Sequence, residues 1–62
     1  MIYTILNETT GITTEDYYRD LDVCRDDCLE YAEENPGTNF AIIEEWGVNS
    51  RTIEVYGPGP LA

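Results

Sequence analysis

A helix-like pattern of apolar positions lies in the middle of the chain, between strand-like runs. Apolar residues recur at intervals of four and three: Tyr17, Leu21, Cys24, Cys28 and Tyr31. Side chains at this spacing share one side of an α-helix. The pattern therefore predicts an amphipathic helix over residues 14–34, about 30 Å long.

The predicted helix has local signals at both ends. Thr13 stands three residues before Asp16, the spacing at which a threonine caps a helix and an acid supports it. At the other end, Asn35-Pro36-Gly37 stops the helix. Proline cannot continue a helix, and asparagine or glycine readily takes the left-handed cap conformation.

Three runs rich in β-branched and aromatic residues predict strands: Met1–Asn7, Asn39–Trp46 and Thr52–Tyr56. Gly47–Ser50 has the composition of a hairpin loop between the last two. We expect one α+β domain over residues 1–56, followed by a flexible Gly/Pro tail over 57–62.

The predicted order is β-α-β-β, a three-stranded antiparallel sheet with the helix on one face and the first strand beside the last. The alternative is ββαββ, in which Ile12–Tyr18 is a strand paired with the first and the helix starts near Asp22. The long apolar stripe favours the first arrangement.

One helix covers one face of such a sheet. Phe40, Ile42 and Trp46 point one way from their strand, whereas Ala41 and Ile43 point the other way. We therefore expect an uncovered apolar face that serves self-association or a partner, with a homodimer as one outcome.

Composition narrows the function. The chain has 62 residues, a formal net charge of −10 and no lysine. So small a domain has little room for an internal pocket. A charge of −10 repels nucleic acid and anionic lipid and attracts basic surfaces, so we expect no direct nucleic-acid or membrane partner. The sequence contains neither a signal-peptide pattern nor a long apolar segment, so a cytoplasmic location is expected.

The acids are concentrated on the predicted helix. At about 100° per residue, nine of them occupy a wedge of roughly 160° opposite the apolar stripe. They are Glu15, Asp16, Asp20, Asp22, Asp26, Asp27, Glu30, Glu33 and Glu34. Like charges four residues apart repel by a few tenths of a kcal/mol per pair, and acids near a helix C-terminus oppose the helix dipole. An acidic face with these unfavourable placements indicates a binding surface rather than plain solvation.

Other chemistry is poorly supported. Cys24 and Cys28 lie one turn apart on the apolar side, and the chain has no histidine to complete a zinc site. We interpret them as free thiols in the core. Arg25 and Tyr31 stand where a calcium loop needs glycine and glutamate. Ser50, the only serine, has no histidine or lysine to activate it. No enzyme activity, metal or cofactor is expected.

These observations lead to a functional hypothesis. Nine acids along about 30 Å match the roughly nine phosphates on the same length of one DNA strand. We expect a small acidic inhibitor that blocks a basic, nucleic-acid-binding surface of a host protein, with Trp46 or an exposed tyrosine as the anchor. Such chains resemble, in size and charge, phage-encoded inhibitors of the anti-CRISPR or anti-restriction type, which act in the host cytoplasm by DNA mimicry. The alternatives are an assembly subunit that oligomerises through the uncovered sheet face, and a helix-led adaptor.

Overall fold

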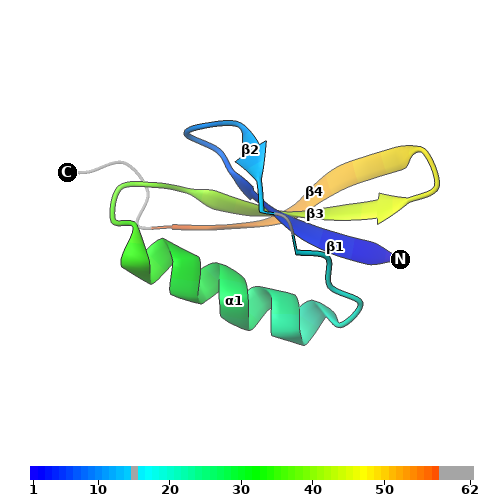
Figure 1. The fold of residues 1–62 in the computed structure, drawn as a ribbon, viewed down its shortest axis with the longest axis horizontal. Helices are drawn as coiled ribbons and strands as arrows, with labels where there is room; N and C mark the ends of the chain where they lie inside the picture. The colour runs from blue at the N-terminus through cyan, green and yellow to red at the C-terminus, as the bar shows by residue number, and fades with distance from the viewer. Residues whose placement is uncertain (15, 58–62) are drawn as a thin grey trace.

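The computed structural model describes residues 1–14 and 16–57, which form one antiparallel sheet with a helix on one face (Figure 1). The elements in chain order are β1 (Ile2–Asn7), β2 (Ile12–Thr13), α1 (Leu21–Glu34), β3 (Phe40–Trp46) and β4 (Asn49–Tyr56). The α+β class is confirmed. The alternative order, ββαββ, is correct. The favoured three-stranded β-α-β-β order is wrong because residues 12–13 add a short strand.

The strand order differs from the prediction. The sheet runs β2-β1-β3-β4, so β3 is central and β1 pairs with β3 rather than with the last strand. The reason is that β3 is apolar on both faces. Phe40, Ala41 and Ile42 are all buried, and a strand of this kind gains most from neighbours on both sides.

The segment before the helix is extended rather than helical, because its backbone pairs with the outer edge of β1. Tyr3 and Tyr18 exchange two backbone hydrogen bonds of 2.8 Å, and the Thr14 N–H donates to the Ile5 carbonyl at 2.8 Å. These bonds satisfy edge groups of β1 that would otherwise stay open. The predicted helix start at residue 14 is therefore wrong.

Asp20 is the residue that starts α1. Its backbone is extended, and its carboxylate accepts a hydrogen bond from the Asp22 N–H at 2.9 Å. An aspartate in this position satisfies one of the free N–H groups of the first helical turn. Thr13, the predicted cap, lies in β2 instead, and Tyr17 is 68% exposed outside the helix.

The helix ends at the predicted residue, but its last turn is capped by a contact other than the predicted left-handed conformation of Asn35. Asn35 is not left-handed (φ −128°); its backbone N–H and its side-chain amide both donate to the Tyr31 carbonyl, at 3.1 and 2.9 Å. Gly37 takes the positive φ, +86°, that turns the chain toward β3.

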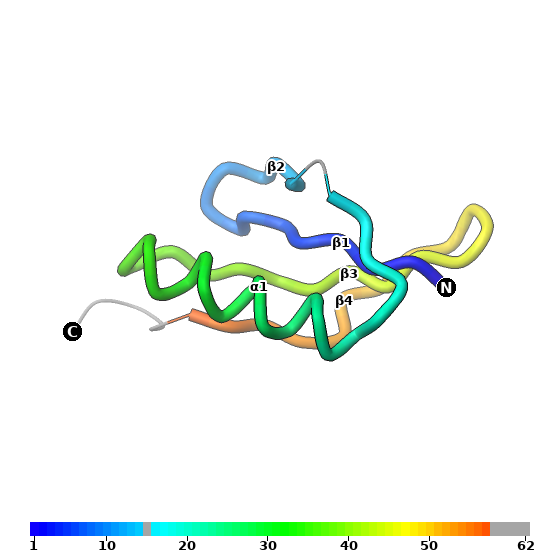
Figure 2. The backbone as a smooth tube through the Cα atoms, turned by 60° about the horizontal axis from the view of Figure 1, so that its bottom comes forward, coloured from blue at the N-terminus to red at the C-terminus, as the bar shows by residue number. Residues whose placement is uncertain are grey.

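The core lies between α1 and the sheet. It is built from a small set of buried residues: Ile5, Cys24, Cys28, Ala32, Phe40 and Ile42. Figure 2 shows α1 running along the sheet, where it packs against β3, β1 and β4. The Tyr31 ring stacks on Phe40 with a centroid distance of 5.7 Å. In the described residues, no helix is long and apolar enough to cross a membrane.

The β3–β4 hairpin projects past the start of α1 in both views (Figures 1 and 2). Its loop is the dipeptide Gly47-Val48, shorter than the predicted Gly47–Ser50, since Asn49 already pairs with Trp46. Gly47 has φ +59°, which the first position of a two-residue hairpin turn of this kind requires.

Candidate functional site

The acids of α1 form the most distinctive surface of the molecule. Six acids lie within Leu21–Glu34, and at about 100° per residue they span roughly 140° of the helix surface, away from the sheet. We call this set the acidic face: Asp22, Asp26, Asp27, Glu30, Glu33 and Glu34. All except Asp27 are exposed.

Three predicted members of this face are not on the helix. Asp16 lies in the extended link beside β1, where its carbonyl accepts a 3.3 Å hydrogen bond from the Thr4 hydroxyl. Asp20 is the helix cap and continues the acidic face at its N-terminal end. Glu15 lies outside the described residues.

Asp27 is anchored at the border of the acidic face. The Tyr18 hydroxyl donates to it at 2.7 Å, which ties the extended link to the helix. Burial, together with this hydrogen bond and the negative charge of Asp27, raises the pKa of Tyr18 well above its usual value. Tyr18 therefore stays a neutral donor and Asp27 a fixed acceptor.

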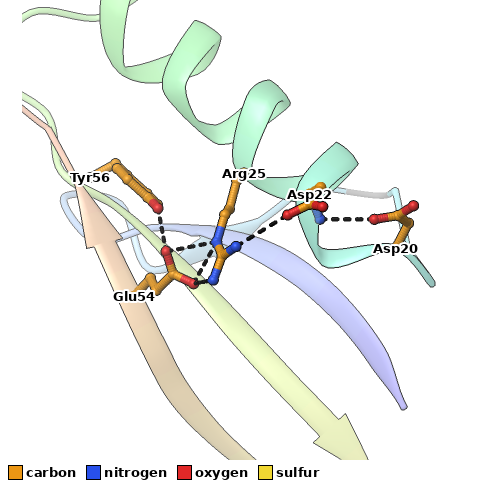
Figure 3. A network of polar contacts seen from close by, with 5 residues as sticks. All are labelled: Asp20, Asp22, Arg25, Glu54 and Tyr56. Atoms are coloured by element: carbon orange, nitrogen blue, oxygen red, sulfur yellow. Dashed lines mark hydrogen bonds and ion pairs between the residues drawn. The ribbon is translucent and has the colours of Figure 1, made fainter.

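Arg25, the only basic residue of α1, points from the helix toward Glu54 on β4 (Figure 3). Its Nη2 lies 2.7 Å from a carboxylate oxygen of Glu54 on β4, and its Nε donates to both oxygens at 3.0 and 2.8 Å. Tyr56 also donates to Glu54. Asp22 is the one acid of the face that Arg25 touches, at 3.2 Å.

These contacts shift the protonation equilibria of the network. The hydrogen bonds from Arg25 and Tyr56 lower the pKa of Glu54, and the bond to Glu54 raises the pKa of Arg25 and that of Tyr56. The Arg25–Glu54 pair thus stays ionised near neutral pH, and the arginine remains held over the sheet.

Most acids of the acidic face form no ion pair within the part of the chain that the structure describes. Among the described residues, the remaining ion pair joins Arg51 to the buried Glu44 at 3.0 Å, on the hairpin. Four exposed acids of the face take part in none of these pairs: Asp26, Glu30, Glu33 and Glu34. Their charge is therefore available to a partner.

A shallow hollow of about 290 Å³ lies on the acidic face. Three acids and one aromatic ring line it: Asp27, Glu30, Glu34 and Tyr31. The sequence indicates Tyr31 only as a core residue, yet it is half-buried and its ring reaches this surface. Tyr31 lies at the margin of the apolar stripe, and this position could have indicated that it contacts both the core and the acidic face.

Trp46 does not lie with the acidic face. It ends β3 on the projecting hairpin, is 40% exposed, and has the Arg51 guanidinium 5.7 Å from its ring centroid. Val23, in contrast, is 49% exposed and falls within the angular range of the helix acids. Helical spacing alone places it there, although the sequence interpretation gave it no role.

The two cysteine thiols of the described residues are poorly suited to act as nucleophiles. Cys24 and Cys28 are free and fully buried, and burial raises the pKa of each thiol to about 11. Nucleophilic cysteines need the opposite shift. No three His, Cys, Asp or Glu side chains in residues 1–14 and 16–57 are grouped so that they could hold a metal ion.

Comparisons with known proteins leave the site to be interpreted from its own geometry. The chain matches no model of a known protein family, no curated protein and no solved structure.

Proposed function

We propose that this protein binds the basic surface of another protein through the acidic face of α1. The observation that carries the proposal is the separation of charges. The one arginine of the helix is held by Glu54 on the sheet, and four exposed acids have no ion-pair partner within residues 1–14 and 16–57. A surface that served solubility alone would mix both signs of charge.

The isolated fold is penalised by this arrangement. Acids four residues apart repel one another at Asp22/Asp26, Asp26/Glu30 and Glu30/Glu34, by a few tenths of a kcal/mol per pair. The last turn of α1 carries Glu33 and Glu34 and no basic residue, so its charge opposes the helix dipole. A cationic partner would relieve both effects.

The spacing of the acids suits a groove that ordinarily holds nucleic acid. The 14 residues of α1 extend about 21 Å, a length over which one DNA strand carries about six phosphates. Six helix acids supply a similar charge density. By occupying a Lys- and Arg-lined groove, the chain would act as an inhibitor of nucleic-acid machinery, of the anti-CRISPR or anti-restriction type that phages encode.

The hollow beside Tyr31 offers a place where one basic side chain of the partner could bind. Its three carboxylates and one aromatic ring are the groups that receive an arginine or lysine side chain, by charge-assisted hydrogen bonds and by cation–π contact. The two reduced, buried thiols accord with action in the host cytoplasm. Trp46 lies on the hairpin rather than on α1, so it would add to this contact where the partner also reaches β3.

Charge reversal with a matched control tests the proposal. The chain is immobilised and used to capture proteins from a lysate of its host cells, with duplex DNA added as competitor. Asp26→Lys/Glu30→Lys moves the formal net charge from −10 to −6, as does the control Glu8→Lys/Asp16→Lys on exposed sites off the helix.

We expect the helix variant to weaken binding of the captured protein about 30-fold or more and the control about threefold or less, since partner contacts rather than total charge decide affinity. Duplex DNA should displace the captured protein. Equal losses in the two variants, or capture that DNA leaves unchanged, would contradict nucleic-acid mimicry by the acidic face.

A second candidate, an assembly subunit, is favoured by the sheet face opposite α1. Strand alternation and register place Ile2, Leu6, Ala41, Ile43 and Val55 on that face. Ile2 is 39% and Val55 53% exposed. If Ile2→Lys removes the captured protein and the helix variant does not, this open face is the working surface instead.

A further inference from the structure

The two edges of the sheet are protected very differently. On the β1 side, β2 and the link that contains Tyr18 occupy the edge through the backbone hydrogen bonds described above. On the other side, no strand in the described part of the chain pairs with the outer edge of β4. An open edge is a template for a further strand.

The open edge of β4 is regular only in its second half. A bulge places Ile53 outside the pairing, between Glu54, which pairs with Ile42, and Thr52, which pairs with Ile43. Such a bulge disturbs strand addition to the residues around it. Glu54, Val55 and Tyr56 form a regular ladder with β3, so their outward backbone groups remain suited to pairing.

An apolar groove of about 470 Å³ lies beside this segment. It is lined from the helix side by Leu29, Ala32, Glu33 and Pro36 and from the strand side by Val55, Tyr56 and Gly57. Leu29 is 43% exposed, and it is the apolar side chain of the groove most open to solvent from α1. A strand added to β4 would place alternate side chains into this groove.

The far end of the groove is fixed by close backbone packing. A Cβ on Gly57 would stand 2.9 Å from the Asn39 Cα and 2.9 Å from the Thr38 carbonyl oxygen, so only glycine fits there. The end of β4 is therefore held against the connection between α1 and β3. Backbone contacts therefore fix the strand side of the groove at its end.

Charge selects the occupant. Glu33 lines the groove, and the C-terminal end of α1, with its negative dipole end and no basic residue, lies beside it. A second copy of this chain carries −10 and would bring two acidic helices to the same side of a joined sheet. The negative charge beside the groove therefore attracts a basic strand and repels a second copy of this chain.

We propose that the edge of β4 at Glu54–Tyr56, with the adjoining groove, binds an extended segment of a partner protein that alternates apolar and basic side chains. Main-chain hydrogen bonds to β4 supply affinity, and the apolar side chains seat against Leu29. This site lies on the flank of α1 toward β4. It shares Glu33 with the acidic face and does not depend on the other acids of that face being functional.

A synthetic peptide tests the proposal directly. The probe is a fluorescently labelled eight-residue peptide of alternating valine and lysine, blocked at both ends. Its control carries the same side chains with the four central backbone nitrogens methylated, so that it keeps its charge and loses its donors. Binding is followed by fluorescence anisotropy, and amide hydrogen exchange locates the contact.

Two exposed apolar residues provide matched protein variants. Leu29→Gln changes the groove, and Val23→Gln changes a residue of similar exposure, 49% against 43%, outside it. We expect Leu29→Gln to weaken peptide binding about tenfold, Val23→Gln to weaken it less than about twofold, and peptide to protect amides within Glu54–Tyr56. Circular dichroism confirms that both variants fold.

Several results would overturn the proposal. The unmethylated peptide could fail to bind, or the methylated peptide could bind as tightly as the unmethylated one. The two glutamine variants could also weaken peptide binding equally. Loss of binding only in Asp26→Lys/Glu30→Lys would assign the peptide to the acidic face instead. Protection of the β4 amides by self-association, seen as a concentration-dependent mass in sedimentation, would make a second copy the occupant.

Discussion

At the scale of single residues, the two cysteines show how a chemically reactive side chain becomes a packing group. Cys24 and Cys28 lie one turn apart against the sheet and are fully buried. The Cys28 Sγ lies 3.8 Å from the Phe40 carbonyl oxygen. Burial disfavours the thiolate and raises both pKa values to about 11. Their interpretation from sequence as free core thiols is confirmed.

These pKa values predict loss of stability at high pH. The folded chain keeps two thiol protons that the unfolded chain releases from about pH 8.5 upward. A group with a raised folded pKa stabilises the fold below its unfolded pKa, and that contribution is lost as pH rises toward about 11. Urea unfolding in a reducing buffer should show a falling free energy of unfolding between about pH 8.5 and 11.

The variant Cys24→Ala/Cys28→Ala serves as the comparison. Its free energy of unfolding should be lower at neutral pH, because two buried sulfurs are lost, and should fall less steeply over the same pH range. Identical slopes for the two proteins would show that the thiols do not carry this pH dependence.

At the scale of secondary-structure elements, the start of α1 depends on Asp20. The variant Asp20→Ala removes the cap and should lower the free energy of unfolding by about 1 kcal/mol. The variant Asp20→Asn should lower it by less than half as much, because an asparagine side chain also accepts the hydrogen bond from the Asp22 N–H. Chemical denaturation monitored by circular dichroism measures both. Equal losses would mean that the charge at residue 20, rather than the cap, stabilises the helix.

Of the helix predicted over residues 14–34, the second part forms as expected and the first part does not. The stripe formed by Leu21, Cys24, Cys28 and Tyr31 faces the core as expected. Tyr17 fits the same spacing but is exposed, because Tyr18 pairs with Tyr3 across the edge of β1. That pairing joins residues 15 apart in sequence, so local periodicity cannot reveal it.

The order of the strands was missed for a similar reason. Alternation along β3 correctly separates Phe40 and Ile42 from Ala41 and Ile43. The burial of Ala41 as well as Ile42 shows that β3 needs a neighbour on each side. A sequence in which β3 and β4 form a hairpin leaves open which of the two also pairs with β1.

At the scale of the whole molecule, charge and apolar surface are separated onto different faces. In Figure 1, α1 lies on one side of the sheet, and the described residues place no helix on the other side. The acidic face lies on the side of α1 away from the sheet, and the groove is lined by residues of both α1 and β4. The placement of six acids on one side of α1 could be predicted from helical spacing. The diversion of Arg25 to Glu54 could not, because it joins residues 29 apart in sequence.

The most direct test of the acidic face is the salt dependence of its affinity for the protein that it captures. Exposed charges without internal partners are screened as ionic strength rises, since the Debye length falls from about 10 Å at 0.1 M to about 3 Å at 1 M. Isothermal titration calorimetry between 50 and 500 mM salt measures this dependence. We expect the Kd to rise about tenfold or more over this range. The Asp26→Lys/Glu30→Lys variant should show a shallower slope. A Kd that changes less than about twofold over this range would contradict binding through the acidic face.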